Sequence, residues 1–391
     1  MSIDLSLRLK KIKPSPTLAL AAKARELKAQ GKDIIDLTVG EPDFPTCVQA
    51  KDAAIKAINN NFTKYTAVEG TLSLREAIVQ KLLHENELKY DASQILVSCG
   101  AKHSLYNLFQ AILDPKDEVI IPAPYWVSYP DMVVLAEGMP VFITTAMEQG
   151  FKIMPRQLEA AITPKTKAFI LNSPSNPTGM VYNERELEEL AQVLLKYPQV
   201  LVVSDDIYEH ILWEGRFTNL VNANSALYAR SVVVNGMSKV YAMTGWRMGY
   251  AAGPKNIIAG MKNLQSQSTS NPTSIVQIAA EAALKGDQSH VKIMRDEFKK
   301  RHDFLLKELG LISGIEIIPA QGAFYVFPKV LGLMKKRNCS TDMEFADLLL
   351  NKAEIAVVPG SAFGAPGYIR ISYATSMENL EKAIGRIKQN F

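Results

Sequence analysis

Short apolar segments rich in valine and isoleucine recur through the middle of the chain. Segments that are apolar throughout, rather than at every second position, are typical of strands covered on both faces of a sheet. The strands predicted in this way are Ile95 to Ser98, Glu118 to Pro122, Lys167 to Asn172, Val200 to Ser204, Ser231 to Asn235 and Met248 to Ala252. Helical segments lie between several of them, so the pattern predicts a doubly wound α/β domain with a mainly parallel sheet.

Helical spacing of apolar residues predicts three helices in and after this region. They extend from residue 102 to 113, from 184 to 196 and from 289 to 309. The second has a strong start signal, because Asn183 can cap its first turn and Glu186 follows three residues later.

Beyond residue 310 the pattern changes to shorter elements. Strands are predicted at Ile315 to Ile318, Ala323 to Phe327, Ile355 to Val358 and Tyr368 to Tyr373, and helices at Met343 to Lys352 and Ser376 to Gln389. We interpret this alternation as a smaller α/β domain at the C-terminal end.

The composition excludes several classes of partner. The 391 residues include 44 Lys and Arg against 40 Asp and Glu, a net charge of +4, and the two signs alternate along the chain. Neither a nucleic acid nor a membrane partner is therefore expected. There is no run of about 18 apolar residues and no hydrophobic core for a signal peptide, so we expect a cytoplasmic protein.

The metal-ligating residues are few and scattered. The three cysteines are widely separated and form no CxxC pair, which excludes a disulfide framework and a four-thiolate zinc site. The five histidines show no paired metal-ligand spacing. We therefore expect no metal site.

Two polar segments directly follow predicted buried strands, at the sheet edge where open α/β sheets bind ligands. Residues 172 to 179 contain two X-Pro bonds, which can fix an unusual backbone, including a cis bond, although a plain polar turn is the simpler explanation. Residues 202 to 209 end in Asp205, Asp206 and Tyr208. A buried acid needs a cation nearby, unless these acids cap a solvated strand end.

A third segment, Asn235 to Gly249, carries Lys239 and Arg247 eight residues apart. A lysine that is partly desolvated beside other cations becomes a nucleophile toward an aldehyde, because its charged form is disfavoured. Arginine offers a planar fork for a phosphate. The simpler alternative is a surface lysine and an arginine in a salt bridge.

The stretch from Gly236 to Gly249 resembles the pyridoxal-phosphate attachment signature of the class I aminotransferases. That pattern is Gly or Ser, apolar, small, Lys, two free positions, small, apolar, free, Gly, free, Arg, apolar, Gly, and it fits throughout. The resemblance extends from Gly40 to Tyr373, which is nearly the whole chain. Within the family the sequence looks most similar to bacterial aspartate aminotransferases of the subgroup that includes aspartate/prephenate enzymes.

The resemblance implies a fold-type I transferase that binds pyridoxal 5'-phosphate covalently at Lys239. Lys239 is then also the base and acid that moves a proton between the substrate Cα and the cofactor C4′. Asp205 is implied to pair with the pyridine nitrogen, and Tyr208 and Asn176 with the phenolate oxygen. Because Asp205 and Tyr208 are three residues apart, the chain must turn after the strand.

The same resemblance places further residues around the cofactor. The implied partners of the phosphate and ring are Gly100, Ala101, Lys102, Trp126, Ser238 and Arg247, with Trp126 stacked on the pyridine. Tyr65 matches a tyrosine that reaches the phosphate of the neighbouring subunit, which implies a homodimer with shared active sites.

Substrate recognition is implied at Arg370, through a bidentate pair with the α-carboxylate, beside the backbone of Gly40 and the side chains of Trp126 and Asn176. Lys13 matches a position associated with the distal carboxylate of dicarboxylic substrates; an exposed N-terminal lysine is the alternative. Two positions depart from the family pattern. Asp206 replaces the usual glutamate, and Glu69 places an acid near the substrate entrance.

These implications predict a homodimeric aminotransferase with ping-pong kinetics that moves the amino group of L-aspartate or glutamate to a 2-oxo acid such as 2-oxoglutarate. Residues 46–290 would form a large cofactor domain, and residues 1–45 and 291–391 a small domain. The alternatives within the fold are prephenate, aromatic, alanine or kynurenine aminotransferases and carbon-sulfur lyases. A nucleotide-dependent dehydrogenase would need a GxGxxG or P-loop segment, which is absent, and a non-catalytic regulator would not need the intact lysine, aspartate and arginine set.

Overall fold

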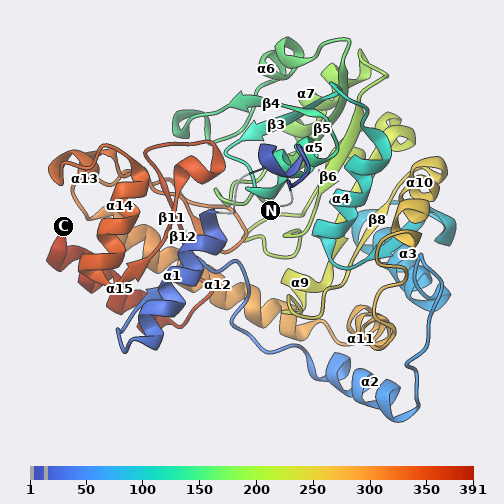
Figure 1. Ribbon diagram of the computed structural model, residues 1–391, viewed down its shortest axis with the longest axis horizontal. Helices are drawn as coiled ribbons and strands as arrows, with labels where there is room; N and C mark the ends of the chain where they lie inside the picture. The colour runs from blue at the N-terminus through green and yellow to red at the C-terminus, as the bar shows by residue number, and fades with distance from the viewer. Residues whose placement is uncertain (1–3, 13–15) are drawn as a thin grey trace.

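A seven-stranded sheet forms the centre of the protein, which we describe from a computed structural model covering residues 4–12 and 16–391. The strands lie in the order β2-β8-β7-β6-β5-β3-β4 (Figure 1). Their bounds are β2 Ile95–Ser98, β3 Glu118–Ala123, β4 Met139–Thr144, β5 Thr166–Asn172, β6 Leu201–Asp205, β7 Ser231–Gly236 and β8 Gly249–Ala252. All neighbours pair in parallel except β8, which is antiparallel to both β2 and β7. The predicted doubly wound, mainly parallel sheet is confirmed.

Both faces of this sheet are buried, which explains the continuous apolar runs in the sequence. In β2, Ile95 and Val97 pack into one hydrophobic core and Leu96 into another. In β7, Val233 and Val232 divide between the same two cores. Strand residues alternate between faces, so a strand with helices on both sides needs apolar residues at every position.

Of the strands in this seven-stranded sheet, the sequence pattern missed one, β4. It lies at the edge of the sheet and is half exposed, with Met139 51% and Phe142 45% exposed. It also contains Pro140, which has no amide hydrogen and is tolerated in a sheet mainly at its edge. The buried-strand pattern therefore does not apply to β4.

Helices cover the large sheet and also occur in the rest of the chain. Their bounds are α1 Pro16–Ala29, α2 Val48–Asn59, α3 Leu72–Asn86, α4 Ala101–Ile112, α5 Ser128–Leu135, α6 Pro155–Ala161, α7 Glu184–Leu195, α8 Leu220–Ala223, α9 Met237–Val240, α10 Lys255–Ser266, α11 Ser274–Lys285, α12 Ser289–Gly310, α13 Leu331–Lys336, α14 Asp342–Leu348 and α15 Met377–Asn390. The three helices predicted before residue 310 are α4, α7 and α12. At α7 the predicted cap is present, because Asn183 Oδ1 accepts from Glu186 N at 2.9 Å and Glu186 Oε2 accepts from Asn183 N at 2.8 Å.

The C-terminal region has smaller sheets than the pattern predicted. A three-stranded antiparallel sheet has the order β11-β12-β9, and a parallel pair joins β1 to β10. The bounds are β1 Ile35–Asp36, β9 Tyr325–Val326, β10 Ile355–Ala356, β11 Val358–Pro359 and β12 Ile369–Ser372. The last predicted helix is α15.

Three predictions in this region need correction. Residues 315–318 form no strand; they are partly exposed and make one isolated bridge, between Glu316 and Lys329. The strand predicted at 355–358 is two strands, since β10 and β11 pair with different partners. The helix predicted at 343–352 is α-helical only to Leu348 and continues as a π-helical turn, Leu349–Ala353.

Both ends of the chain meet in this region. β1 pairs with β10, and Figure 1 shows the blue helix α1 among the orange and red C-terminal elements. Ile35 and Leu37 share a hydrophobic core with residues of α12 and α15. The domain boundaries stay a prediction. Among the described residues, no helix has the length and apolar character needed to cross a membrane.

Candidate active site

A cavity of about 320 Å³ lies where β5, β6 and β7 end. Parallel strands place their carboxyl ends at one sheet edge, so the three polar segments that follow them in sequence meet in space. The cavity is lined by these predicted site residues: Gly40, Ala101, Lys102, Trp126, Asn176, Asp205, Tyr208, Ser238, Lys239, Arg247 and Arg370. A larger hollow of about 640 Å³, between residues 212–218 and α12, contains none of them.

Three predicted residues are not among those that line the cavity. Gly100 lies directly before α4 and contacts Arg247 rather than the open space. Tyr65 is 91% exposed on the surface of the chain. Lys13 falls outside the described residues.

Lys239 lies on the short helix α9, which follows β7 directly. Its Nζ donates to the carbonyl oxygen of Gly40 at 2.5 Å. Burial lowers the pKa of this amine to about 8, and the positive charge of Arg370 acts in the same direction. A lysine with this pKa is a neutral nucleophile for a large fraction of the time near pH 8.

Asp205 is the last residue of β6 and is 3% exposed. Its Oδ2 accepts from the hydroxyl of Tyr129 at 2.5 Å. Burial raises the pKa of this carboxyl to about 6, while the Tyr129 hydrogen bond and the charge of Lys239 oppose that rise.

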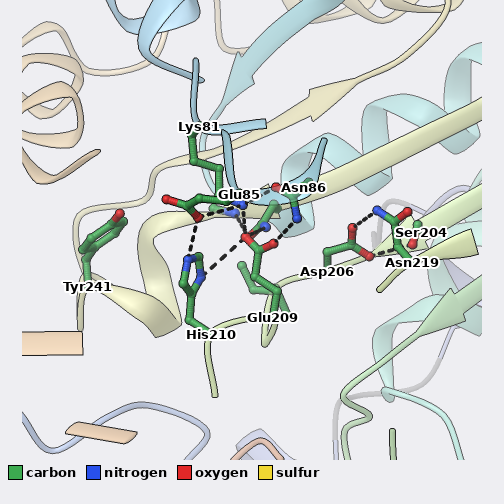
Figure 2. A network of polar contacts seen from close by, with 12 residues as sticks. Lys81, Glu85, Asn86, Ser204, Asp206, Glu209, His210, Asn219 and Tyr241 are labelled. Carbon is green, nitrogen blue, oxygen red and sulfur yellow. Dashed lines mark hydrogen bonds and ion pairs between the residues drawn. The ribbon is translucent and has the colours of Figure 1, made fainter. Parts of the chain in front are cut away.

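We expected a cation beside the two acids after β6. Among residues 4–12 and 16–391, no cation forms an ion pair with either of them, and Lys239 acts on Asp205 only over a longer distance. Asp206 instead accepts from Ser204 Oγ at 2.6 Å and Asn219 Nδ2 at 2.8 Å (Figure 2). Asp205 therefore faces the cavity as an acceptor with no cationic partner from the described chain.

The chain turns after Asp205, as the spacing to Tyr208 required. The turn brings the Tyr208 hydroxyl within 2.9 Å of the Tyr325 hydroxyl. The Asn172 side chain donates to the backbone oxygen of Asp205 at 2.8 Å and accepts from Asn176 N at 2.9 Å, so it fixes Asn176 next to the strand end. Both X-Pro bonds of this segment, at Pro174 and Pro177, are cis.

Arg370, on β12, is 3% exposed and lies over the ring of Tyr325, 4.5 Å from its centroid. It donates to Asn176 Oδ1 at 3.0 Å and to the carbonyl oxygen of Thr38 at 2.6 Å. Its buried Nε has no hydrogen-bond partner among the described residues. No carboxylate of the described residues lies within 4.0 Å of its guanidinium, so its charge is free to bind an anion.

The backbone before α4 forms a cradle that only glycine permits. Gly100 has φ +90°, and a Cβ there would lie 2.5 Å from Arg247 Nη2. A Cβ at Gly249 would lie 2.2 Å from the amide nitrogen of Ala101. The free amides of a helix start and a guanidinium suit a phosphate. The donor set, the unpartnered Arg370 Nε and this cradle therefore fit the cofactor that the resemblance implied.

Among the lining residues that the sequence did not single out, Tyr129 and Tyr325 stand out because their hydroxyls hydrogen-bond the side chains of Asp205 and Tyr208. Tyr129 lies three residues after Trp126, and the two rings pack edge to face at 5.3 Å, so helical spacing from Trp126 was a usable signal. Tyr325 lies in an apolar segment that was interpreted as a core strand, and nothing in its local sequence distinguishes it from a core residue.

Comparison with known proteins identifies the family of the chain. The family model described as aminotransferase class I and II matches residues 32–387. The chain is 57% identical to the aspartate/prephenate aminotransferase of Nitrosomonas europaea, over 98% of this chain and 99% of that protein. It is 50% identical to the aspartate aminotransferase of Geobacillus stearothermophilus, over 98% of each.

Solved structures give the same result. The aspartate aminotransferase of Rhizobium meliloti superposes with a TM-score of 0.95 at 44% identity, covering 99% of this chain and 98% of that chain. The aspartate aminotransferase of Thermus thermophilus with maleate gives 0.94 at 43% identity, covering 99% of this chain and 100% of that chain. The chain belongs to the class I and II aminotransferase family.

Proposed function

We propose that the protein is a pyridoxal-phosphate-dependent aminotransferase that moves the amino group of L-aspartate or L-glutamate to a 2-oxo acid by a ping-pong reaction. The observation that carries this proposal is the charge of the cavity. Among the described residues that line it are four cations, Lys102, Lys239, Arg247 and Arg370, and one carboxylate, Asp205. Such a site suits a phosphorylated cofactor together with a carboxylate substrate.

The residues divide this work between them. Arg247 and the amides at the start of α4 hold the phosphate, and Asp205 pairs with the ring nitrogen. When bound, the cofactor supplies an electron-accepting ring next to the substrate Cα. Lys239 Nζ attaches the cofactor and then holds the proton that leaves Cα. Arg370 binds the α-carboxylate through its fork and orients the Cα–H bond.

The pKa of Lys239 gives the first test. Capture of the cofactor needs a neutral amine, so below the pKa of about 8 the capture rate should fall about tenfold for each pH unit. Above about pH 9 it should level off. The growth of the absorbance of the attached cofactor, after cofactor-free protein is mixed with pyridoxal phosphate, measures this rate. Nα-acetyl-lysine, which has a free side-chain amine, is the control. A rate that continues to rise up to pH 10, as for the control, would contradict the lowered pKa.

Dicarboxylate recognition needs a further cation. The resemblance implied Lys102 as a cofactor residue at the start of α4, where its backbone amide can serve; among the described cations that line the cavity, its side-chain charge is the one that the roles above leave unused. Its Nζ lies 5.0 Å from the centroid of the Trp126 ring. The maleate in the Thermus thermophilus structure is a four-carbon dicarboxylate, as aspartate is. We therefore propose that Lys102 binds the distal carboxylate, with Lys13 as the alternative that the sequence raised.

Lys102→Met should raise the KM for L-aspartate about tenfold or more. It should leave the KM for an amino acid with an uncharged side chain nearly unchanged. Steady-state kinetics at saturating cofactor measure this, with Lys13→Met as the parallel variant. A defect that excess pyridoxal phosphate cures would show instead that Lys102 holds the phosphate. A defect confined to Lys13→Met would show that Lys13, and not Lys102, binds the distal carboxylate.

We also propose a homodimer with shared active sites. Tyr65, which the resemblance places at a neighbour's phosphate, is 91% exposed. The outer face of α2 carries Val48, Ile55 and Ile58, each more than half exposed, while its buried residues are only alanines. An apolar outer face of this kind is typical of a protein interface. Sedimentation equilibrium should give twice the mass of one chain, and a fully active monomer would contradict the proposal.

The last part of the proposal concerns the 2-oxo acid that accepts the amino group. Several relatives, including that of Nitrosomonas europaea, are named aspartate/prephenate aminotransferases. We propose prephenate as an additional acceptor because it carries the 2-oxo acid group that Arg370 would bind. Product analysis with L-aspartate and either prephenate or 2-oxoglutarate tests this.

A further inference from the structure

A buried ion pair lies outside the cavity and has no part in the proposed chemistry. It joins Lys81, on α3, to Glu209, in the turn after β6; these residues are 7% and 6% exposed. Lys81 Nζ donates to Glu209 Oε1, and Asn86 Nδ2 donates to Glu209 Oε2 at 2.7 Å (Figure 2). Lys81 also donates to Asn86 Oδ1 at 2.7 Å, so the three side chains form a closed group.

The acids around Lys81 do not form a metal site. Glu85, Glu209 and His210 hold ligand atoms within 4.8 Å of one another. The Lys81 ammonium already hydrogen-bonds Glu209 and lies 3.5 Å from Glu85 Oε2. Lysine therefore supplies the positive charge that these acids need. Burial raises the pKa of Glu209, but Lys81, His210 and Asn86 together outweigh burial and hold the pKa below its usual value, so Glu209 stays an anion.

Glu209 has a further contact that reaches the active site. Its Oε1 accepts from Asn235 Nδ2 at 2.6 Å. Asn235 Oδ1 in turn accepts from the backbone nitrogen of Gly236 at 2.7 Å. Gly236 ends β7, and α9, which carries Lys239, starts at the next residue.

On its other side, Glu209 belongs to the turn that carries Asp205 and Tyr208. It follows Tyr208 directly, and its backbone nitrogen donates to the oxygen of Asp206 at 3.0 Å. One carboxylate thus contacts the two segments that present the acid and the lysine of the site. Neither Glu209 nor Asn235 lines the cavity.

A shift of Gly236 would also reach the phosphate cradle. A Cβ at Gly236 would lie 2.9 Å from Gly249 Cα and 2.9 Å from Met248 O, so the end of β7 and the start of β8 pack backbone against backbone. Met237 N donates to Met248 O at 3.1 Å across the same contact. The position of Gly236 is therefore linked to that of the segment containing Arg247.

We propose that Glu209 is a positioning residue of the active site: through Asn235 it fixes the end of β7, from which α9 and Lys239 follow, against the turn after Asp205, with Lys81 holding Glu209 in place. The meaning of this geometry rests on the proposed function of Lys239 and Asp205. The contact itself does not, so the two can be tested separately.

A pair of double variants isolates the contact to Asn235. Lys81→Met/Glu209→Gln and Lys81→Met/Glu209→Leu both remove the two charges together, so neither leaves a buried unpaired ion. Glutamine keeps an oxygen that can accept from Asn235, and leucine does not. Thermal unfolding of the full-length proteins checks that both are folded.

The main readout is the pKa of Lys239 in cofactor-free protein, from the pH dependence of its acetylation by acetic anhydride, followed by mass spectrometry. We expect the Lys81→Met/Glu209→Gln variant, called the glutamine pair, to keep a Lys239 pKa near that of the unmodified protein. In the Lys81→Met/Glu209→Leu variant, the leucine pair, the Lys239 pKa should rise toward that of an ordinary lysine, because the site is looser and wetter. The Kd for pyridoxal phosphate should increase at least about tenfold in the leucine pair only.

Two double variants with the same Lys239 pKa and the same Kd would overturn the proposal. If the leucine pair does not fold, Asn235→Ala removes the same contact from the other side and must raise the Lys239 pKa in the same way. Acetylation requires neither cofactor nor turnover. A failure of the unmodified protein to bind pyridoxal phosphate would therefore reject the proposed function and leave the positioning role to be decided by acetylation.

Discussion

Lys239→Ala should lower kcat by at least about 10⁴-fold, because one amine both attaches the cofactor and transfers the proton at Cα. The variant should also lose the visible absorbance of the covalently held cofactor. Its fold should survive, since Lys239 is only partly buried and, within the part of the chain that the structure describes, its one side-chain hydrogen bond is to the Gly40 carbonyl. Steady-state kinetics and an absorbance spectrum of the purified variant measure both effects.

The matched control for this prediction is Lys102→Met. Lys102 is a second lysine of the same cavity, so its loss changes the cavity charge equally without removing the attachment point. We expect this variant to keep the visible absorbance. A Lys239→Ala protein that remains coloured after dialysis, or one that turns over at a rate close to the unmodified protein, would show that another amine carries the cofactor.

Arg370→Lys should lower kcat/KM for every amino-acid and 2-oxo-acid substrate by about 10² to 10³-fold. Lysine keeps the charge but has no planar fork. It cannot contact Asn176 Oδ1 and Thr38 O while also binding a carboxylate through two parallel bonds. Most of the loss should appear in KM, because the α-carboxylate is present in both the ground state and the transition state.

Arg247→Lys provides the comparison for Arg370→Lys. Arg247 lies at the Gly100 cradle, so its replacement should weaken the binding of pyridoxal phosphate. The substrate KM should stay nearly unchanged once the cofactor is saturating. Kinetics of both variants with L-aspartate and 2-oxoglutarate separate the two arginines. A loss confined to one substrate of the Arg370→Lys protein would contradict its role as the common carboxylate ligand.

Most of the predicted site residues line one cavity, because many of them directly follow buried strands. The ends of β5, β6 and β7 were predicted within one residue, and the signature from Gly236 to Gly249 named Lys239 and Arg247. Parallel strands then bring those ends together without further information. Local pattern and family resemblance therefore agreed at these positions.

The sequence failed where tertiary context decides. Tyr325 looks like any core residue of a short strand, yet its hydroxyl meets Tyr208 and its ring lies under Arg370. Lys81 occurs on a helix with other charged residues, where a solvated face is the usual interpretation. Its partner Glu209 is 128 positions away, and no local spacing links the two.

Asp206 shows how one departure from the family pattern is accommodated. Burial raises its pKa to about 7, with Glu209 adding repulsion, and Ser204 and Asn219 hydrogen-bond it. These partners hold its side chain, which does not line the cavity. The departure from the family pattern therefore leaves Asp205 in the site.

The most direct test of the central claim is a half-reaction. Cofactor-loaded protein mixed with L-aspartate alone, with no acceptor present, should release one equivalent of oxaloacetate per active site and lose the absorbance of the attached cofactor. Subsequent 2-oxoglutarate should restore that absorbance and yield one equivalent of L-glutamate. Absence of oxaloacetate until an acceptor is added would contradict a ping-pong aminotransferase at this site.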